Sequence, residues 1–360
     1  MLHAMIMAGG GGTRFWPRSR VARPKQFLNF AGATTLLQQA LDRLEVSGIS
    51  AAQSWIVTGQ AYLGESSAQL PAVPQNHLVG EPVGRDTAPC VALGAALIAK
   101  EDPEATILVT PADHVIEPPR EFGRAVHAAA GTIEEHPGAL ATFGIAPTFP
   151  STGYGYIKRG ESLGSRQGVT VYRAAKFEEK PPLERATAFV SSGEYNWNAG
   201  IFVWKAKTIL AAMAKHEPQT HAACLRIADA WGTPKANEVL GREYPSLNKV
   251  SIDKAVMEKH PEVLLVQAPY KWDDVGSWLA LERMQPQDAT GNTVQGTHVG
   301  LKTDNCIIVG DAGKLIGTIG IKDLVIVQDG DCLLVAHKSD EGTVKELVDA
   351  IRKRGLERYL

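Results

Sequence analysis

The chain has 360 residues, and its 37 Lys and Arg residues nearly balance its 39 Asp and Glu residues, which leaves a formal net charge of −2. At about 150 residues per domain, this length predicts two domains, each able to bury a core. The near-neutral balance argues against a protein that coats nucleic acid or an anionic membrane. The four scattered cysteines form no CxxC pair and are typical of a reducing compartment. We therefore expect a cytoplasmic protein with no nucleic-acid and no membrane partner.

The first 285 residues alternate between short apolar runs and stretches of helical periodicity. Strands are predicted at 4–8, 54–58, 106–110 and 140–145, and helices at 35–44, 88–100 and 121–135. The first run lacks the basic flank of a signal peptide and leads into a glycine loop, so we interpret it as a buried strand. This alternation predicts an α/β fold with a Rossmann-like mixed, mostly parallel sheet flanked by helices. Ligands of such sheets bind beyond the carboxyl ends of the strands, here from Gly9, Pro111 and Gly144 onward.

The pattern changes after about residue 286. Short apolar runs begin at residues 305, 314, 323 and 331, with Gly or Asp between them and no long helix. Such a repeat predicts stacked β-helix coils, with an ordinary small sandwich as the alternative. The DGD at 329–331 lies between two runs and is interpreted as a plain turn, and residues 344–351 predict a terminal amphipathic helix. The predicted domains are 1–285 and 286–360.

A glycine-rich loop at residues 9–12 follows the first strand. Glycines allow successive backbone N–H groups to converge on an anion. Five cations follow without an acid, and both cation types bind phosphate oxygens: Arg14, Arg18, Arg20, Arg23 and Lys25. The loop is neither a Walker A motif nor a G-x-G-x-x-G fingerprint, because no Gly-Lys pair precedes Ser or Thr and Arg14 stands at the third glycine position. The sequence therefore predicts a polyphosphate site of another kind.

This loop matches the pattern G-G-x-G-T-R-x-x-P-x-[ST]-x(4)-P-K, through Gly9, Gly10, Gly12, Thr13, Arg14, Pro17, Ser19, Pro24 and Lys25. The chain thereby resembles the sugar-1-phosphate nucleotidylyltransferases, and its RFWPRSR and PKQFL segments are similar to the mannose-1-phosphate guanylyltransferase branch. The resemblance implies a GT-A-like nucleotidyltransferase fold followed by a small left-handed β-helix that forms a homodimer. It also implies GTP and mannose 1-phosphate as substrates, Mg²⁺ as cofactor, and four catalytic residues: Arg14, Lys25, Asp113 and Lys180.

Two acidic positions are candidates for holding the metal. Asp113 follows the strand at 106–110, and the adjacent acids Asp273 and Asp274 lie in a distant turn. Two carboxylates over one site suit an octahedral ion that keeps several waters. The resemblance implies Asp113 and Asp274 as the metal pair and leaves the role of Asp273 open. No histidine metal motif is present in the sequence, so His114 is interpreted as structural or as a residue that supports the neighbouring ligand Asp113.

Three later motifs together supply the carboxylate, amide and backbone groups that hexose hydroxyls require. They are GYGY at 153–156, FEEKP at 177–181 and NAG at 198–200, and each taken singly is more often structural. Their order matches the family. By this resemblance the sugar-phosphate site consists of Gly153, Tyr154, Glu179, Lys180, Asn198 and Gly200, with Lys180 on the phosphate.

Glu81 is the candidate for reading the base. One carboxylate can accept hydrogen bonds from both N1–H and N2–H₂ of guanine, whereas uracil or thymine would leave it unpaired. Guanylyltransferases carry a similar E-P-x-x-R-x-T-A-P; a turn followed by an Asp86 helix cap is the alternative. The predicted nucleotide-binding residues are Ala8, Gly9, Gly10, Gly12, Thr13, Arg14, Lys25, Glu81, Pro82, Arg85, Thr87, Ala88 and Pro111.

The expected reaction is GTP plus α-D-mannose 1-phosphate to GDP-mannose plus pyrophosphate, by in-line attack of the sugar phosphate. A different nucleotide or hexose is the alternative within the class. A non-catalytic subunit that senses GDP-mannose is the alternative outside it. Such a subunit would be free to lose Arg14, Lys25 or the acid pair, all of which are present.

Overall fold

The computed structural model describes residues 1–30 and 32–360 and consists of two compact units. The sheet unit contains Met1–Gly9, Gln38–Ala112 and Ile116–Trp272, and the β-helix unit contains Gly10–Leu37, Asp113–Val115 and Asp273–Leu360. These units cut across the expected boundary at residue 285, because residues 10–37 belong to the same unit as the C-terminal strands. No helix of the described chain has the length and apolar composition needed to cross a bilayer.

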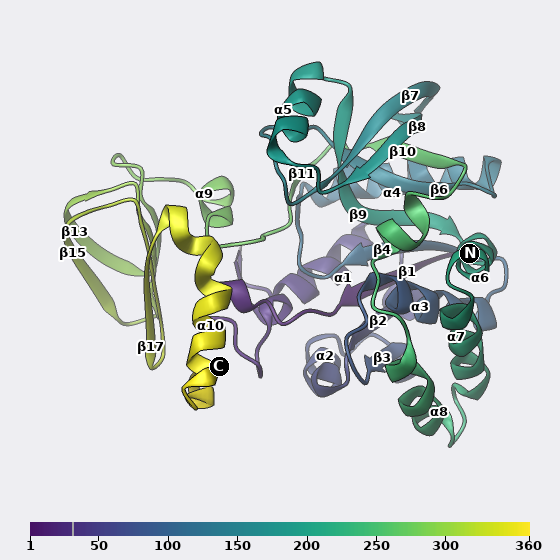
Figure 1. Cartoon of the computed structure of the whole chain (residues 1–360), viewed down its shortest axis with the longest axis horizontal. Helices are drawn as coiled ribbons and strands as arrows, with labels where there is room; N and C mark the ends of the chain where they lie inside the picture. The colour runs from purple at the N-terminus through teal and green to yellow at the C-terminus, as the bar shows by residue number, and fades with distance from the viewer. Residues whose placement is uncertain (31) are drawn as a thin grey trace. The chain divides into compact units, whose positions relative to one another are not determined.

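The sheet unit is built on one mixed sheet with the strand order β3-β2-β1-β4-β9-β6-β10-β8-β7 (Figure 1). Its strands are β1 (Leu2–Ala8), β2 (Ser54–Gly59), β3 (Leu78–Glu81), β4 (Thr106–Pro111), β6 (Leu140–Ile145), β7 (Gly155–Arg166), β8 (Val169–Glu179), β9 (Tyr195–Lys205) and β10 (Val263–Gln267). The four strands of the β3–β4 half are parallel, and so is the β6–β10 pair. Pairings of β9, and of β8 with β7 and β10, are antiparallel. The expected parallel arrangement thus holds for the first half, while the tight turn between β7 and β8 requires antiparallel pairing.

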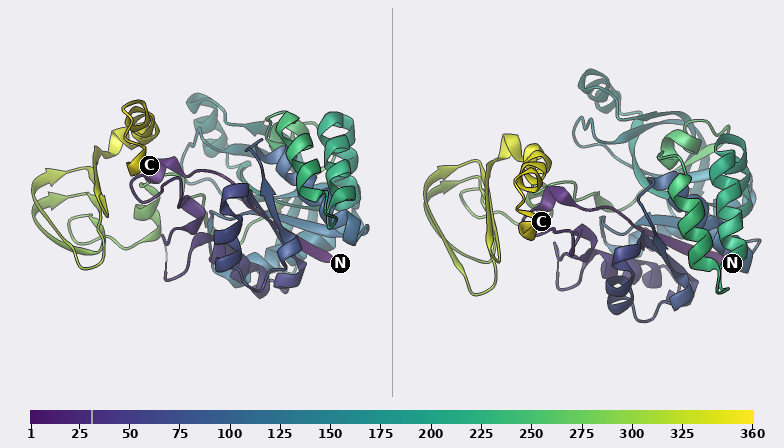
Figure 2. Two further views of the ribbon diagram at one scale, coloured as in Figure 1. Left: turned by 90° about the horizontal axis from the view of Figure 1, so that it is seen from below. Right: turned by 60° about the horizontal axis from the view of Figure 1, so that its bottom comes forward.

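Helices flank this sheet. They are α1 (Leu36–Val46), α2 (Leu63–Gln69), α3 (Thr87–Glu101), α4 (Pro119–Glu135), α5 (Leu183–Ser192), α6 (Ala206–His216), α7 (Pro218–Ala230) and α8 (Ala236–Glu243). The helices α6 and α7 run side by side and pack on α3, which is buried from Ala88 to Ile98 (Figure 2). A helix that is apolar on all sides must be covered on all sides. The predicted strands and helices of this unit are confirmed to within about two residues at each end, which is ordinary for such boundaries.

The β-helix unit stacks short strands, of which all but the last pair in parallel. They are β12 (Thr293–Gln295), β13 (Thr297–Asp304), β14 (Ile307–Val309), β15 (Leu315–Lys322), β16 (Leu324–Asp329) and β17 (Cys332–His337). Thr297 lies opposite Leu315 and Ile307 opposite Val325, so one coil takes 18 residues and each predicted apolar run is half a coil. The β-helix prediction is confirmed, and the alternative of a small sandwich is not. An antiparallel partner, β17, closes the stack, and Asp329–Asp331 is the predicted turn before it.

The core of the β-helix unit includes the chain that follows the glycine loop. Phe15 packs edge-to-face on Phe30 and on Trp278, with ring centroids 4.5 and 5.2 Å away. These rings join apolar side chains of β14, β16 and the predicted terminal helix, α10 (Val344–Lys353), in one buried cluster. The short helix α9 (Ala280–Met284) adds Ala280 and Leu281 to it. The shared core explains why residues 10–37 belong to this unit.

Candidate active site

The glycine loop is shaped around the side chain of Lys25. Gly12 adopts φ +55°, a conformation that favours glycine, and a Cβ there would lie 2.4 Å from the Cβ of Lys25. The Ser19 hydroxyl donates to the carbonyl of Gly12 at 2.6 Å and fixes the loop from the other side. Gly10 also has a positive φ, at +117°, and Thr13 begins a 3₁₀ turn, Thr13–Phe15. The loop is therefore a fixed cradle for Lys25.

Lys25 joins the two acidic segments that the sequence singled out. Its ammonium donates to Asp113 Oδ2 at 2.7 Å and to the carbonyl oxygen of Asp274 at 2.6 Å, although the side chain is only 8% exposed. Burial acts to raise the pKa of Asp113, but the Lys25 ammonium, with His114 beside it, outweighs burial and holds that pKa below its ordinary value. Asp113 is thus held as a carboxylate. Arg14 donates to the carbonyl of Gly276 at 3.1 Å.

These groups surround a hollow of about 290 Å³ within the β-helix unit, lined by Gly12, Thr13, Arg14, Phe15, Lys25, Asp113, His114, Asp274, Val275 and Gly276. Among the described residues, no cluster of three or more His, Cys, Asp or Glu is placed to hold a metal. Mg²⁺ is commonly bound by one or two carboxylates together with waters and substrate phosphates. The Asp113 and Asp274 carboxylates of this hollow fit that donor set.

The neighbouring acids at 273 and 274 have different surroundings. Asp273 accepts two hydrogen bonds from Arg283, at 2.5 and 3.0 Å, and one from the amide of Val275 at 2.8 Å. Asp274 instead lines the hollow, and its Oδ2 lies 2.9 Å from the position that a Cβ on Gly276 would occupy. Asp273 therefore has protein partners, Arg283 and Val275, whereas Asp274 faces the hollow.

Three of the five loop cations, all of which were expected to bind phosphate, pair instead with protein groups. Arg18 donates to the carbonyl of Gly310 at 3.1 Å, Arg20 to Asp331 Oδ1 at 3.0 Å, and Arg23 to both carboxylate oxygens of Asp329. Their partners are turn carbonyls and acids of the β-helix coils. No local pattern indicates this pairing, since more than 280 residues separate the partners.

In the sheet unit, Glu81 ends β3 and is buried, 7% exposed. Its Oε1 accepts a hydrogen bond from the hydroxyl of Tyr244, and its Oε2 lies 3.5 Å from where a Cβ on Gly9 would be. Burial raises the pKa of Glu81 to about 7, against the lowering effect of the Tyr244 hydroxyl. Ala8 and Pro111 end the adjacent strands β1 and β4.

The rest of the predicted base motif divides into an exposed turn and a helix start. Pro82 is exposed, while Arg85 donates to the carbonyl of Pro245. Asp86 accepts from the amide of Thr87 at 2.8 Å, which is the helix cap that the alternative foresaw. The Thr87 hydroxyl accepts from the amide of Ile252 at 2.8 Å. Ala88 is fully buried, and its amide donates to the carbonyl of Val250, so this amide already has a protein partner.

The predicted sugar residues Glu179, Lys180 and Asn198 do come together. Lys180 pairs with Glu179 Oε1 at 2.9 Å, and this hydrogen bond raises the pKa of Lys180. The Asn198 amide is oriented, since Oδ1 accepts from the Gly200 amide at 3.2 Å and Nδ2 donates to Asp253 Oδ1 at 2.8 Å. Burial, followed by the charge of Glu179, raises the pKa of Asp253 to about 7.

Gly153 and Tyr154 lie just before β7, where an aromatic group gathers. The ring of Tyr154 packs edge-to-face on those of Trp197 and Trp272, at centroid distances of 5.0 and 5.3 Å. Gly155, at the start of β7, would place a Cβ 2.5 Å from Glu179 Oε2, so glycine is required for the carboxylate to lie there. Flat aromatic surfaces beside carboxylate and amide groups are typical of carbohydrate sites.

Sequence reasoning missed two residues that contact the predicted ones, Asp253 and Tyr244. Asp253 stands in a short π-helix, Asp253–Met257, in the segment SIDKAV, which matched no motif. Tyr244 lies in the turn YPS, which also matched no motif. Their only signal is polarity within otherwise buried surroundings, and that becomes visible only once the fold brings them to Asn198 and Glu81.

The glycine loop with its buried lysine, the acid pair and the mixed sheet are typical of the nucleotidyl transferases, which work by placing charge around phosphorus. The sequence matches the family described as nucleotidyl transferase over residues 3–291, and the MannoseP isomerase/GMP-like beta-helix domain over residues 296–351. It is 38% identical to the mannose-1-phosphate guanylyltransferase of Escherichia coli (strain K12), over 98% of this chain and 74% of that protein. It is 37% identical to the enzyme of the same name from Klebsiella pneumoniae, over 100% of this chain and 76% of that protein.

A solved structure from Thermus thermophilus, described as a mannose-1-phosphate geranyltransferase, has the same fold. It superimposes with a TM-score of 0.86 at 35% identity, covering 98% of this chain and 99% of that one. The chain therefore belongs to the nucleotidyl transferase family and, within it, to the mannose-1-phosphate guanylyltransferases.

Proposed function

We propose that the protein catalyses GTP + α-D-mannose 1-phosphate → GDP-mannose + pyrophosphate. The observation that carries this proposal is the Lys25 ammonium, held between the Asp113 carboxylate and the Asp274 carbonyl at the glycine loop. A buried cation and two carboxylates in one hollow suit nucleotidyl transfer, in which the α-phosphorus of a nucleotide passes from one phosphate oxygen to another. The guanylyltransferases of Escherichia coli and Klebsiella pneumoniae supply the identities of the nucleotide and the sugar.

The reaction needs no protein nucleophile. An anionic oxygen of the sugar phosphate attacks the α-phosphorus, the new O–P bond forms, and the bond from the α-phosphorus to the bridging oxygen breaks with release of pyrophosphate. Arg14 and the loop amides would stabilise charge on the leaving β- and γ-phosphates. Lys25 would neutralise the α-phosphate and Lys180 the incoming phosphate, so that positioning and electrostatics supply the rate enhancement.

Mg²⁺ completes the proposal, with Asp113 and Asp274 as its protein ligands. When bound, the ion would offset phosphate charge that the lysines and arginine leave uncompensated. The Lys25 contact keeps Asp113 ionised and therefore ready to bind a cation.

Guanine is the base that suits Glu81. The carboxylate has two acceptor oxygens, whereas a uracil or thymine edge offers it a single donor beside acceptors. Asn198 and Glu179 are the proposed partners of the sugar hydroxyls, with Asp253 orienting Asn198.

The decisive experiment measures pyrophosphate release for GTP, ATP, UTP and dTTP against the 1-phosphates of mannose, glucose and N-acetylglucosamine, with and without Mg²⁺. GTP with mannose 1-phosphate and Mg²⁺ should give the highest turnover. Asp274→Asn should reduce kcat by about 100-fold, while the matched change Asp273→Asn should retain turnover and lower thermal stability. A higher rate with UTP would refute the base assignment, and equal turnover in both variants would refute the metal pair. No turnover with any pair would favour the GDP-mannose sensor.

We also propose a cytoplasmic homodimer formed through the β-helix unit. Supporting it, one face of the β13–β15 pair exposes four large apolar side chains that register and alternation place together: Val299, Leu301, Leu315 and Ile319. The cysteines are free thiols, as a reducing compartment would keep them. Leu301→Asp should give monomers in analytical ultracentrifugation, whereas Val335→Asp on β17 should not; dimers in both variants would refute this interface.

A further inference from the structure

Tyr244 and Glu81 form a buried polar pair in the core of the sheet unit. Tyr244 is fully buried and its hydroxyl donates to Glu81 Oε1. The other carboxylate oxygen, Oε2, lies toward Gly9, the first residue of the glycine loop and the only one of its four that belongs to the sheet unit. Each carboxylate oxygen has two acceptor positions, so Oε1 can hold Tyr244 and still accept a second donor.

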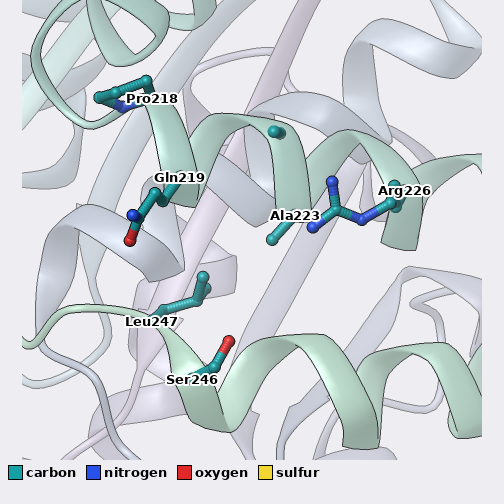
Figure 3. A pocket seen from close by; sticks show the side chains of 7 residues that line it. Pro218, Gln219, Ala223, Arg226, Ser246 and Leu247 are labelled. Carbon is teal, nitrogen blue, oxygen red and sulfur yellow. The ribbon is translucent and has the colours of Figure 1, made fainter.

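The backbone next to Tyr244 is held by Arg85. Tyr244 begins a 3₁₀ turn, Tyr244–Ser246, and the next carbonyl, that of Pro245, accepts a hydrogen bond from Arg85. Ser246, which ends the turn, and the following Leu247 face α7 across a hollow of about 440 Å³ (Figure 3). One turn thus contacts both the carboxylate and the arginine of the predicted base motif.

We propose that Tyr244 is a positioning residue for base selection: its hydroxyl holds the Glu81 carboxylate in the orientation that accepts the N1–H and N2–H₂ donors of guanine. This inference rests on the proposed use of Glu81 to read the base. Without the hydroxyl, the carboxylate can rotate and Oε1 loses a buried partner, so both the orientation and the charge that guanine requires are weakened.

The surroundings of Glu81 make this hydroxyl important. The ionisable groups whose charges act on Tyr244, besides Glu81 itself, are Cys90 of α3 and Cys224 of α7. None of them is a cation, and burial raises the pKa of both thiols, which keeps them neutral. Burial also raises the pKa of Glu81, and the Tyr244 hydrogen bond opposes that shift. Removing the hydroxyl should therefore favour the protonated form of Glu81 near neutral pH.

The test compares Tyr244→Phe with the unaltered protein, using GTP and ITP as nucleotides. ITP keeps the N1–H donor and lacks the 2-amino group. We expect the KM for GTP to rise about tenfold at pH 7 with kcat within about twofold, since a hydrogen bond to a charged group is lost. The preference for GTP over ITP should fall, and the KM defect should shrink between pH 6.5 and pH 8.5 as Glu81 ionises.

Two further variants separate the possible failures. Tyr270→Phe is the matched control, because the Tyr270 side chain is also buried and its hydroxyl has no hydrogen-bond partner among the described residues; its kinetics should not change. Glu81→Gln should abolish the GTP preference. If Glu81→Gln does so while Tyr244→Phe leaves both the preference and the pH profile unaltered, the role of Tyr244 is refuted and that of Glu81 stands. If neither variant changes the preference, the base assignment itself is wrong.

Discussion

Gly12→Ala is expected to disable the enzyme through Lys25 while leaving the fold in place. The added Cβ would lie 2.4 Å from Lys25 Cβ and 2.8 Å from Lys25 N, whereas carbon atoms pack at about 3.5 Å or more. The residue would also have to keep φ +55°, which costs an L-residue about 1–2 kcal/mol. Relief therefore requires a shift of about 1 Å at Lys25, and a misplacement of that size costs about 100-fold in rate.

Pyrophosphate release at saturating substrates gives the required kcat, and circular dichroism checks the fold. Gly11→Ala is the matched control, because its φ is not positive and the nearest atom to its Cβ would be Thr13 Cγ2 at 3.8 Å. We expect Gly11→Ala to keep most of the activity. Full turnover in Gly12→Ala, with Lys25 still paired to Asp113 in a crystal structure, would show that the loop adapts and that our account of its rigidity is wrong.

Three further outcomes are expected. Gly276→Ala places a Cβ 2.9 Å from Asp274 Oδ2, so the Mg²⁺ concentration for half-maximal activity should rise about tenfold in a Mg²⁺ titration. Because the pKa of Glu81 is about 7 in the folded protein and 4.5 ordinarily, the folded state binds more protons than the unfolded state between these two pH values. The protein should therefore lose stability as the pH rises through this range. In thermal melts, Glu81→Gln should be more stable than the unaltered protein above pH 7, by up to about 3 kcal/mol, and no more stable near pH 4. Asp329→Ala removes the acid that binds Arg23 and should lower the melting temperature and raise the KM for GTP severalfold, whereas the more exposed Asp331→Ala should do less.

Local sequence patterns predicted much of the fold because the periodicity of apolar residues depends on the secondary structure of the same segment. The apolar run at 106–110 could only be a buried strand, and the strand end then placed Asp113 at the carboxyl edge of the sheet. The half-coil spacing of the C-terminal runs similarly predicted stacking, which the 18-residue register confirms.

The remaining features depend on contacts between distant segments. Nothing near Arg20 indicates that its partner stands 311 residues later, and an unbroken basic run is equally suited to phosphate. The Tyr244 hydroxyl and the Asp253 carboxylate are similarly uninformative until burial makes an unpaired polar group costly. The importance of these groups depends on the buried surroundings that the tertiary fold creates, so the spacing of sequence motifs does not reveal them.

The attachment of the glycine loop to the C-terminal coils bears on how this chain could be divided. Family boundaries suggest a catalytic module ending near residue 291 and a separable appendix after it. A protein truncated there would lose the acids and carbonyls that hold Arg18, Arg20 and Arg23, together with the α10 side chains packed beside Phe15. The coils therefore hold the segment that follows the glycine loop in place, and exchanging them between relatives would require exchanging residues 10–37 as well.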